Sequence, residues 1–158
     1  MPKLRPTTYA FRAEFGAPVS YAYRWCTDYT SDDPRLAKES YVRRIIRRSS
    51  RHVTYEDLEE VPEGWHWSHS EISLTPPNRW HAEITGSHRD WTIDYTLRAL
   101  PNDRSELLFR GRRTPTEVGG PNPGRVELTA ELRTLWTNYG SALDRDYRTT
   151  LKRREKNR

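Results

Sequence analysis

The apolar residues near the C-terminus follow the spacing of an α-helix. Between Val126 and Leu151 they recur every three or four positions, which places them along one stripe of a helix. At about 1.5 Å per residue this helix would be roughly 39 Å long, so it requires a large partner surface. We expect its first half to form the wall of any space between helix and partner, and its second half to close the core. The stripe consists of Leu128, Leu132, Leu135, Trp136, Tyr139, Leu143, Tyr147 and Leu151.

Alternating apolar and polar positions earlier in the chain indicate β-strands. The clearest is Trp91–Ala99, where the odd-numbered residues are apolar and the even-numbered ones are polar. In Trp65–Leu74 the apolar positions change from odd to even numbers, which predicts a bulge or a bend. The other expected strands are Thr8–Phe15, Tyr41–Ser50, His52–Glu60, Arg79–Gly86 and Glu106–Thr114.

Two short helices are expected after the first strand. Pro18 is suited to the first turn of a helix that runs to about Asp28, and Asp32-Asp33-Pro34 is typical of a second helix start. The resulting fold class is α+β, with roughly seven antiparallel strands that wrap around the C-terminal helix. We expect one domain over residues 1–158, with a basic end at 152–158 that frays into solvent.

Composition points to an aromatic core. Only 34% of the residues are hydrophobic and the mean hydropathy is -1.02, yet the chain has 6 Trp and 9 Tyr. Cys26 is the only cysteine, which excludes an internal disulfide and fits a reducing compartment. No apolar run approaches the ~20 residues of a transmembrane helix, and the N-terminus has no signal-peptide core. We therefore expect a cytoplasmic protein.

A net charge of +5 raises the alternative of a nucleic-acid or acidic-partner binding module. The basic residues gather at 43–51 and at 148–158. The second group suits the solvated C-terminal end of a helix, where cations interact favourably with the helix dipole. For that reason we do not expect nucleic acid as the partner.

The order of elements resembles the START-like helix-grip superfamily, which includes polyketide cyclase/dehydrase-type and lipid-transfer proteins. The similarity covers nearly the whole chain. It implies a bent antiparallel sheet that grips the C-terminal helix, with a cavity between them for a lipid, sterol, polyketide or other apolar molecule. It is carried by Phe15-Gly16-Ala17-Pro18-Val19, by Trp91 to Leu97 followed by Pro101-Asn102-Asp103, and by the last helix around Leu132, Leu135, Trp136 and Tyr139.

Large rings on the inner faces of sheet and helix are the candidate ligand-binding residues. Rings that cannot all interdigitate leave a concave apolar space, in which phenol and indole groups provide polar contacts. The alternative is that the same rings simply fill the core. The candidates are Trp67, Trp80, Trp91, Tyr95, Phe109, Leu132, Trp136 and Tyr139.

An arginine-rich strand follows the two short helices. Arg44 and Arg48 share one face of this strand, while Arg43 and Arg47 share the other. Either it is an edge strand that charge protects from aggregation, or one face directs guanidinium groups to the cavity mouth to hold an anionic head group. Arg44 and Arg48 are our candidates for binding an anion.

Signals for catalysis are weak. His66, His81 and Tyr95 are possible proton carriers. His66 and His69 should lie on opposite faces of a strand, and the chain has no nucleophile elbow, Walker loop or dinucleotide glycines, so we expect no metal and no cofactor. We expect binding, or transport, of a small amphipathic or apolar molecule; the alternative is a metal-free cyclase/dehydrase-type enzyme that acts on an aromatic or polyketide-like substrate.

Overall fold

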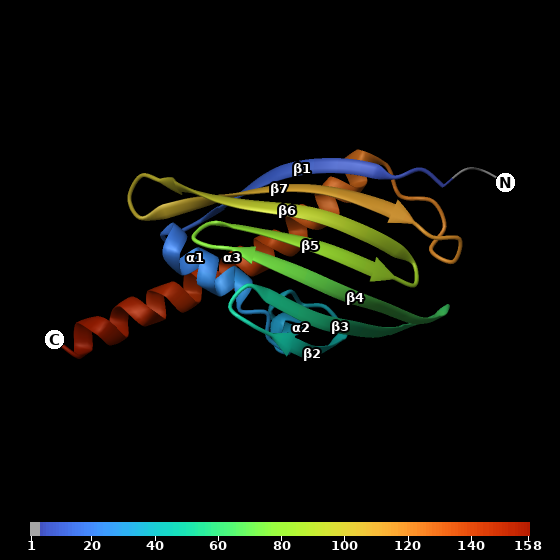
Figure 1. The fold of residues 1–158 in the computed structure, drawn as a ribbon. Helices are drawn as coiled ribbons and strands as arrows, with labels where there is room; N and C mark the ends of the chain where they lie inside the picture. Colours follow the sequence, from blue (N-terminus) through green and yellow to red (C-terminus); the bar gives the residue numbers. More distant parts are fainter. Residues whose placement is uncertain (1–3) are drawn as a thin grey trace.

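The computed structural model describes residues 4–158. Over these residues the chain forms a seven-stranded antiparallel sheet, ordered β1-β7-β6-β5-β4-β3-β2, and three helices (Figure 1). The α+β class and the order of elements predicted from the sequence are confirmed. The elements are β1 (Thr7–Phe15), α1 (Val19–Thr27), α2 (Asp33–Leu36), β2 (Val42–Arg48), β3 (His52–Val61), β4 (Gly64–Thr75), β5 (Arg79–Gly86), β6 (Arg89–Leu100), β7 (Arg104–Pro115) and α3 (Arg125–Lys156).

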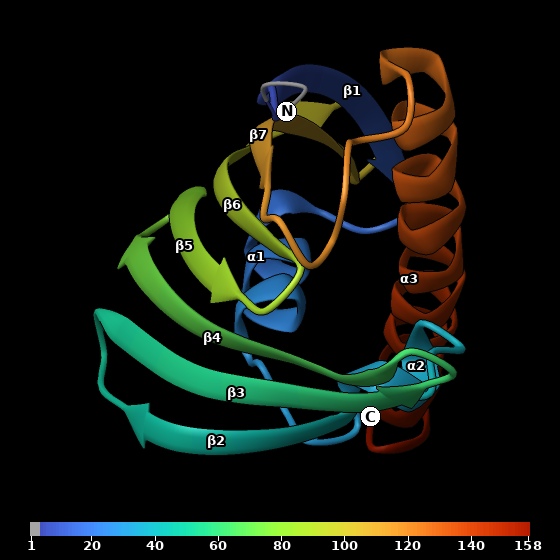
Figure 2. The same ribbon diagram turned by 90° about the vertical axis from the view of Figure 1, so that its right-hand side faces the viewer.

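The sheet curves around α3, which lies on its concave side (Figure 2). α3 approaches β1 closely at Gly140, where a β-carbon would lie 3.4 Å from the ring of Phe15. Asp144 of α3 accepts a hydrogen bond of 2.8 Å from the backbone N–H of Gly16, and Asp146 accepts one of 2.9 Å from the Trp25 indole of α1. These contacts fix the second half of α3 against β1 and α1.

The predicted register of α3 is correct. Trp136, at 9% exposure, and Leu143, at 0%, are both buried on the face that meets the sheet. The helix continues past Leu151 to Lys156, whereas the sequence suggested a frayed end there. Its basic last turns are exposed to solvent.

Of the bulge or bend expected in β4, the bulge is absent, and that part of the prediction was wrong. β4 pairs with β3 in one continuous register, and its buried positions, such as Ser70 and Ile72, are all even-numbered. Trp65 and Trp67 lie instead on the outer face, 58% and 50% exposed, so the two apolar sets belong to opposite faces of a regular strand. The register shift of the sheet's edge lies in β2, between Ile45 and Arg47.

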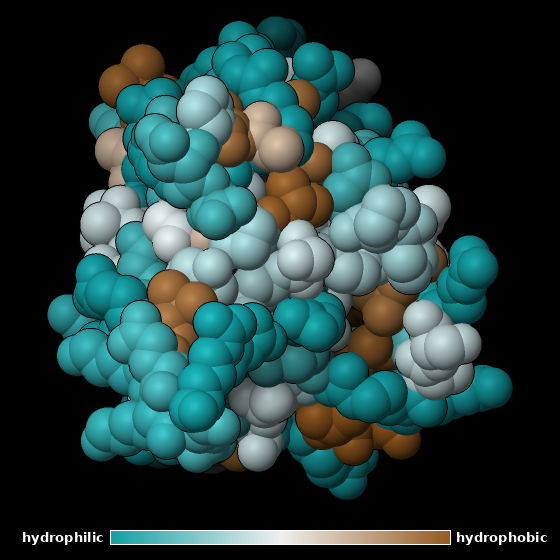
Figure 3. Space-filling view, turned by 90° about the vertical axis from the view of Figure 1, so that its left-hand side faces the viewer, coloured by the Kyte–Doolittle hydropathy of each residue, from teal (hydrophilic) through white to brown (hydrophobic). Residues whose placement is uncertain are grey.

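Polar side chains dominate the face of the molecule that Figure 3 shows, and the hydrophobic ones form small separate groups there. On the outer face of the sheet, His81 lies 2.7 Å from both Glu83 and Asp94. No helix within residues 4–158 is long and apolar enough to cross a membrane.

Candidate functional site

A cavity of about 280 Å³ lies between the concave face of the sheet and α3. Its central wall is aromatic. The rings of Tyr95 and Phe109 pack edge-to-face with their centroids 5.0 Å apart. Their centroids lie 5.9 and 6.2 Å, respectively, from that of the Trp136 indole on α3. Tyr139 extends the wall one helical turn later, with its ring centroid 5.3 Å from that of Trp136. The helical stripe and the inward positions of β6 and β7 therefore enclose the space together.

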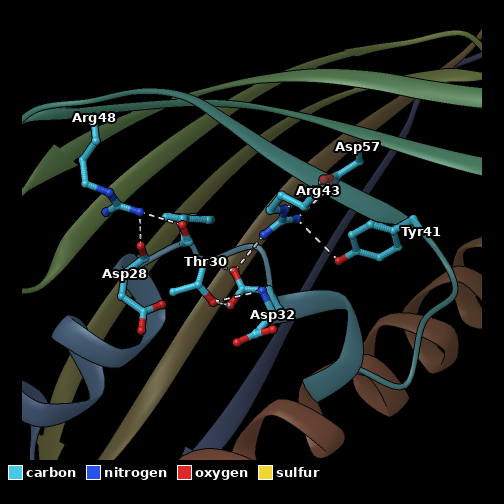
Figure 4. Close-up of polar contacts among 9 residues, drawn as sticks. Asp28, Thr30, Asp32, Tyr41, Arg43, Arg48 and Asp57 are labelled. Atoms are coloured by element: carbon cyan, nitrogen blue, oxygen red, sulfur yellow. Dashed lines mark hydrogen bonds and ion pairs between the residues drawn. The ribbon is translucent and has the colours of Figure 1, made fainter.

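Arg43 lines the β2–β3 side of this cavity, and only 6% of its side chain is exposed (Figure 4). Its Nε and Nη2 donate to the two carboxylate oxygens of Asp57 at 2.8 and 3.0 Å, and its Nη1 donates to Asp33 at 2.8 Å. The guanidinium carbon lies 3.9 Å from the centre of the Tyr55 ring. Burial opposes the charge of Arg43, but Tyr55 and Asp57 outweigh it and raise the pKa of Arg43. This arginine is thus fully engaged within the protein.

Several buried tyrosines surround that arginine and keep their protons. Burial raises the pKa of Tyr41 to about 12, and it also raises the pKa values of Tyr95 and Tyr139 above the ordinary phenol range. Burial raises the pKa of Cys26, which also lines the cavity, so its sulfur remains a thiol at neutral pH. The cavity therefore offers neutral hydroxyl groups as hydrogen-bond donors and acceptors rather than nucleophiles.

The β6–β7 side is built differently. Arg89 and Trp91 are inward-facing residues of β6, and Arg113 is the cross-strand neighbour of Trp91 on β7. Both guanidinium carbons lie near the indole of Trp91, at 5.9 Å for Arg89 and 5.3 Å for Arg113. Burial and the charge of Arg89 lower the pKa of Arg113 to about 10. This side carries positive charge that the protein itself does not neutralise by an ion pair within residues 4–158.

Two histidines lie close together among the residues that line the cavity. The rings of His66 on β4 and His88 in the β5–β6 turn have centroids 3.3 Å apart, and both residues line the cavity. Burial, together with His66 and Arg89, lowers the pKa of His88. An imidazole can accept or donate a proton, which makes the two histidines candidate acid-base groups of the cavity.

Comparison with known proteins identifies the architecture. Neither a protein-family model nor a curated protein matches the sequence. Among solved structures, Zhui aromatase/cyclase from Streptomyces sp. R1128 is 12% identical with a TM-score of 0.70, over 90% of this chain and 93% of that chain. A START superfamily protein from Mycobacterium smegmatis is 14% identical with a TM-score of 0.70, over 87% of this chain and 97% of that chain. The chain has the START-like helix-grip fold. At these identities the likeness establishes the fold alone.

In this helix-grip structure most of the ligand-binding candidates lie around the cavity. Trp80 is the exception: it is 2% exposed and stacks on Tyr95 at 4.6 Å, with Tyr23 against it at 5.8 Å, so it fills the core. Trp67 contributes only to the rim, since it belongs to the outer face. The candidates that line the cavity are Trp67, Trp91, Tyr95, Phe109, Leu132, Trp136 and Tyr139.

Arg44 and Arg48, the predicted anion-binding pair, do not line the cavity. Arg44 points outward, 75% exposed, with its Nη2 3.3 Å from Glu56. Arg48 donates to the backbone carbonyls of Asp28 and Tyr29 at the end of α1 (Figure 4). The prediction chose the wrong face of β2, because the inward position belongs to Arg43 and the register shift beyond Ile45 redirects the rest of the strand.

Of the three possible proton carriers, His66 and Tyr95 line the cavity and His81 does not. His81 is held on the outer face between two carboxylates. His66 and His69 lie on opposite faces, as expected from their spacing, and no group of three potential metal ligands occurs within the described part of the chain. Arg89 was not predicted to face the cavity, because the expected strand began at Trp91 whereas β6 begins at Arg89. Its odd number, shared with the inward residues Trp91 and Tyr95, would have indicated its orientation.

Proposed function

We propose that the protein binds a small amphipathic or apolar molecule in the cavity between the sheet and α3. The observation that supports this most directly is the cavity of about 280 Å³, because its walls combine aromatic rings with a few polar groups. Ligand sites typically have this composition, in which apolar walls provide affinity and polar groups fix orientation. Transport would follow from the same binding if the molecule is released elsewhere.

The arrangement of polar groups favours a ligand that is apolar along its length and polar where it meets the phenols. Tyr95 and Tyr139 lie on the central wall, while the carboxylates of Asp33 and Asp57 are occupied by Arg43. A hydroxyl or carbonyl group of a ligand can therefore exchange hydrogen bonds with the phenols without breaking the buried ion pairs.

A fluorescence titration with the neutral apolar dye N-phenyl-1-naphthylamine tests this proposal. We expect saturable binding by the natural chain. Leu132→Trp, which extends an indole from α3 into the cavity, should weaken binding by about tenfold or more, equivalent to ~1.4 kcal/mol. Val126→Trp is the matched control, because Val126 belongs to the same helix and is 84% exposed. Absence of saturable binding, or equal effects of the two variants, would contradict a ligand site in this cavity.

A cyclase/dehydrase-type activity is a second candidate, favoured by the position of His66. Its ring lies against His88 in the cavity lining, and Tyr95 supplies a protonated phenol in the same space. Such an enzyme would use the cavity shape to fold the substrate and these groups to move protons. Incubation with a poly-β-ketone thioester, followed by mass spectrometry, should show ring closure with loss of water by the natural chain and not by His66→Gln. Product formation that is unaffected by this substitution would reject the role of His66.

A further inference from the structure

Arg89, Trp91 and Arg113 form a cationic group on the β6–β7 side, here named the arginine–tryptophan site. Trp91 and Arg113 are directly opposite each other in the antiparallel pair, and Arg89 precedes Trp91 by two residues, so all three project from the same face of the sheet. The two guanidinium carbons lie 5.9 and 5.3 Å from one indole centroid. Arg89 and Trp91 line the cavity that holds the proposed ligand.

The arginine–tryptophan site has unused hydrogen-bonding capacity. Neither arginine makes an ion pair with any carboxylate of residues 4–158. The Nε of Arg113 is buried and has no hydrogen-bond partner among those residues. Two positive charges beside one indole repel each other when no counter-ion is present, and an anion held by Arg89 at the cavity surface would reduce that repulsion.

Other charges near this site do not neutralise it. Glu131 of α3 acts on Arg113 only from beyond ion-pair distance, and Glu63 has a similar distant effect on His88. Glu59, the cross-strand neighbour of His66, accepts a hydrogen bond of 2.6 Å from Ser40. The β6–β7 side therefore remains the cationic side of the cavity.

We propose that the arginine–tryptophan site binds the carboxylate of an apolar acid whose body occupies the aromatic cavity. This inference rests on the proposed function and adds the ligand's charge and orientation. The guanidinium group of Arg89 provides a fork of donors for both carboxylate oxygens, and the indole of Trp91 provides an apolar surface beside it. Arg113 does not line the cavity and adds positive charge from the far side of that lining. The same acid would be disfavoured at the opposite side, where Asp33 and Asp57 outnumber Arg43.

The test is displacement of bound N-phenyl-1-naphthylamine by two competitors of the same ring system, 1-naphthoic acid and 1-naphthalenemethanol. For the natural chain we expect the acid to displace the dye at a concentration at least about tenfold lower than the alcohol. Arg89→Gln should remove most of this preference, and Arg113→Gln, which removes a positive charge outside the cavity lining, should reduce it less. The preference is taken in each variant as the ratio of the two displacing concentrations, so that a change in dye affinity cancels. Arg112→Gln is the matched control, because Arg112 is exposed on the outer face of the same strand as Arg113.

Each outcome decides between the two proposals. Dye binding without preference for the acid overturns the carboxylate site and leaves the ligand cavity intact. A preference that Arg112→Gln reduces as much as Arg89→Gln reflects net charge and also overturns it. Failure of the dye to bind the natural chain contradicts the cavity proposal and this one together. Circular dichroism of every variant, with Arg89→Lys as a charge-preserving substitution expected to retain part of the preference, separates lost recognition from lost folding.

Discussion

On the β2–β3 side of the cavity a buried arginine is held between two carboxylates, whereas on the β6–β7 side two arginines share one indole ring without an ion pair within residues 4–158. Arg43 is positioned by Asp33 and Asp57, so its charge is part of the folded structure. Arg89 lines the cavity without such a partner among residues 4–158, so its charge is available to a ligand, and Arg113 adds to the positive charge beside it. Burial of an arginine next to a cavity therefore does not by itself identify an anion site, because the presence or absence of a carboxylate partner decides its role.

The largest expected effect is on stability at the β2–β3 side. Arg43→Met would leave Asp33 and Asp57 buried without their counter-charge, and we expect the free energy of unfolding to fall by about 3–5 kcal/mol. Arg44→Met should change it by less than about 1 kcal/mol, because Arg44 is an exposed neighbour that pairs with Glu56 at the surface. Urea unfolding followed by circular dichroism measures both values. Similar losses of unfolding free energy in the two variants would show that the buried ion pairs of Arg43 stabilise the fold no more than a surface pair does.

A smaller effect of opposite sign is expected at the β6–β7 side. Arg113→Met retains an apolar stem against Trp91 but removes a buried N–H without a partner and a neighbouring like charge. We expect the free energy of unfolding to rise by about 1 kcal/mol, since Arg113 is only partly buried. The same urea experiment on Arg112→Met, an exposed position, should show a change within about 0.5 kcal/mol. A clear loss of stability in Arg113→Met would mean that this arginine supports the fold as Arg43 does.

The smallest effect is a contrast in histidine titration between the two faces of the sheet. A hydrogen bond to Glu71 raises the pKa of His69 on the outer face, while burial, His66 and Arg89 lower the pKa of His88 at the cavity. His69 thus contributes stability that is complete below pH 6.5, its ordinary pKa, and is lost as the pH rises through its folded value. His88 contributes stability that is present above pH 6.5 and is lost as the pH falls through its lower folded value.

Histidine-selective NMR titration measures this contrast. We expect His69 to titrate above pH 6.5 and His88 below it. Glu71→Gln should return the pKa of His69 toward 6.5 and leave His88 unchanged, because Glu71 is on the opposite face. Addition of an anionic competitor such as 1-naphthoic acid should raise the pKa of His88, since it places a negative charge beside Arg89. Identical titration of the two histidines would show that the cavity lining is not electrostatically distinct.

Local sequence patterns account for the elements and for most of the faces that they bury. The alternation in Trp91–Ala99 and the stripe from Leu128 to Leu143 follow strand and helix periodicity, and each buries its predicted face except at Ala99, which is exposed. Periodicity also predicted that Tyr95, Phe109 and Trp136 line the same cavity, because all three occupy inward positions of elements that pack together. It misled for Trp67, an apolar residue on the outer face, and for Arg44 and Arg48, which do not face the cavity.

Which charges meet depends on the tertiary structure. Arg43 lies opposite Asp57 because of the register between β2 and β3, and it pairs with Asp33 because α2 packs against β2. That Arg89 has no ion pair with a carboxylate of residues 4–158 depends equally on the strand neighbours and on the course of the β5–β6 turn. Cross-strand register and loop path are set by the packing of the whole chain, so local patterns cannot distinguish a paired arginine from one that remains free to bind a ligand.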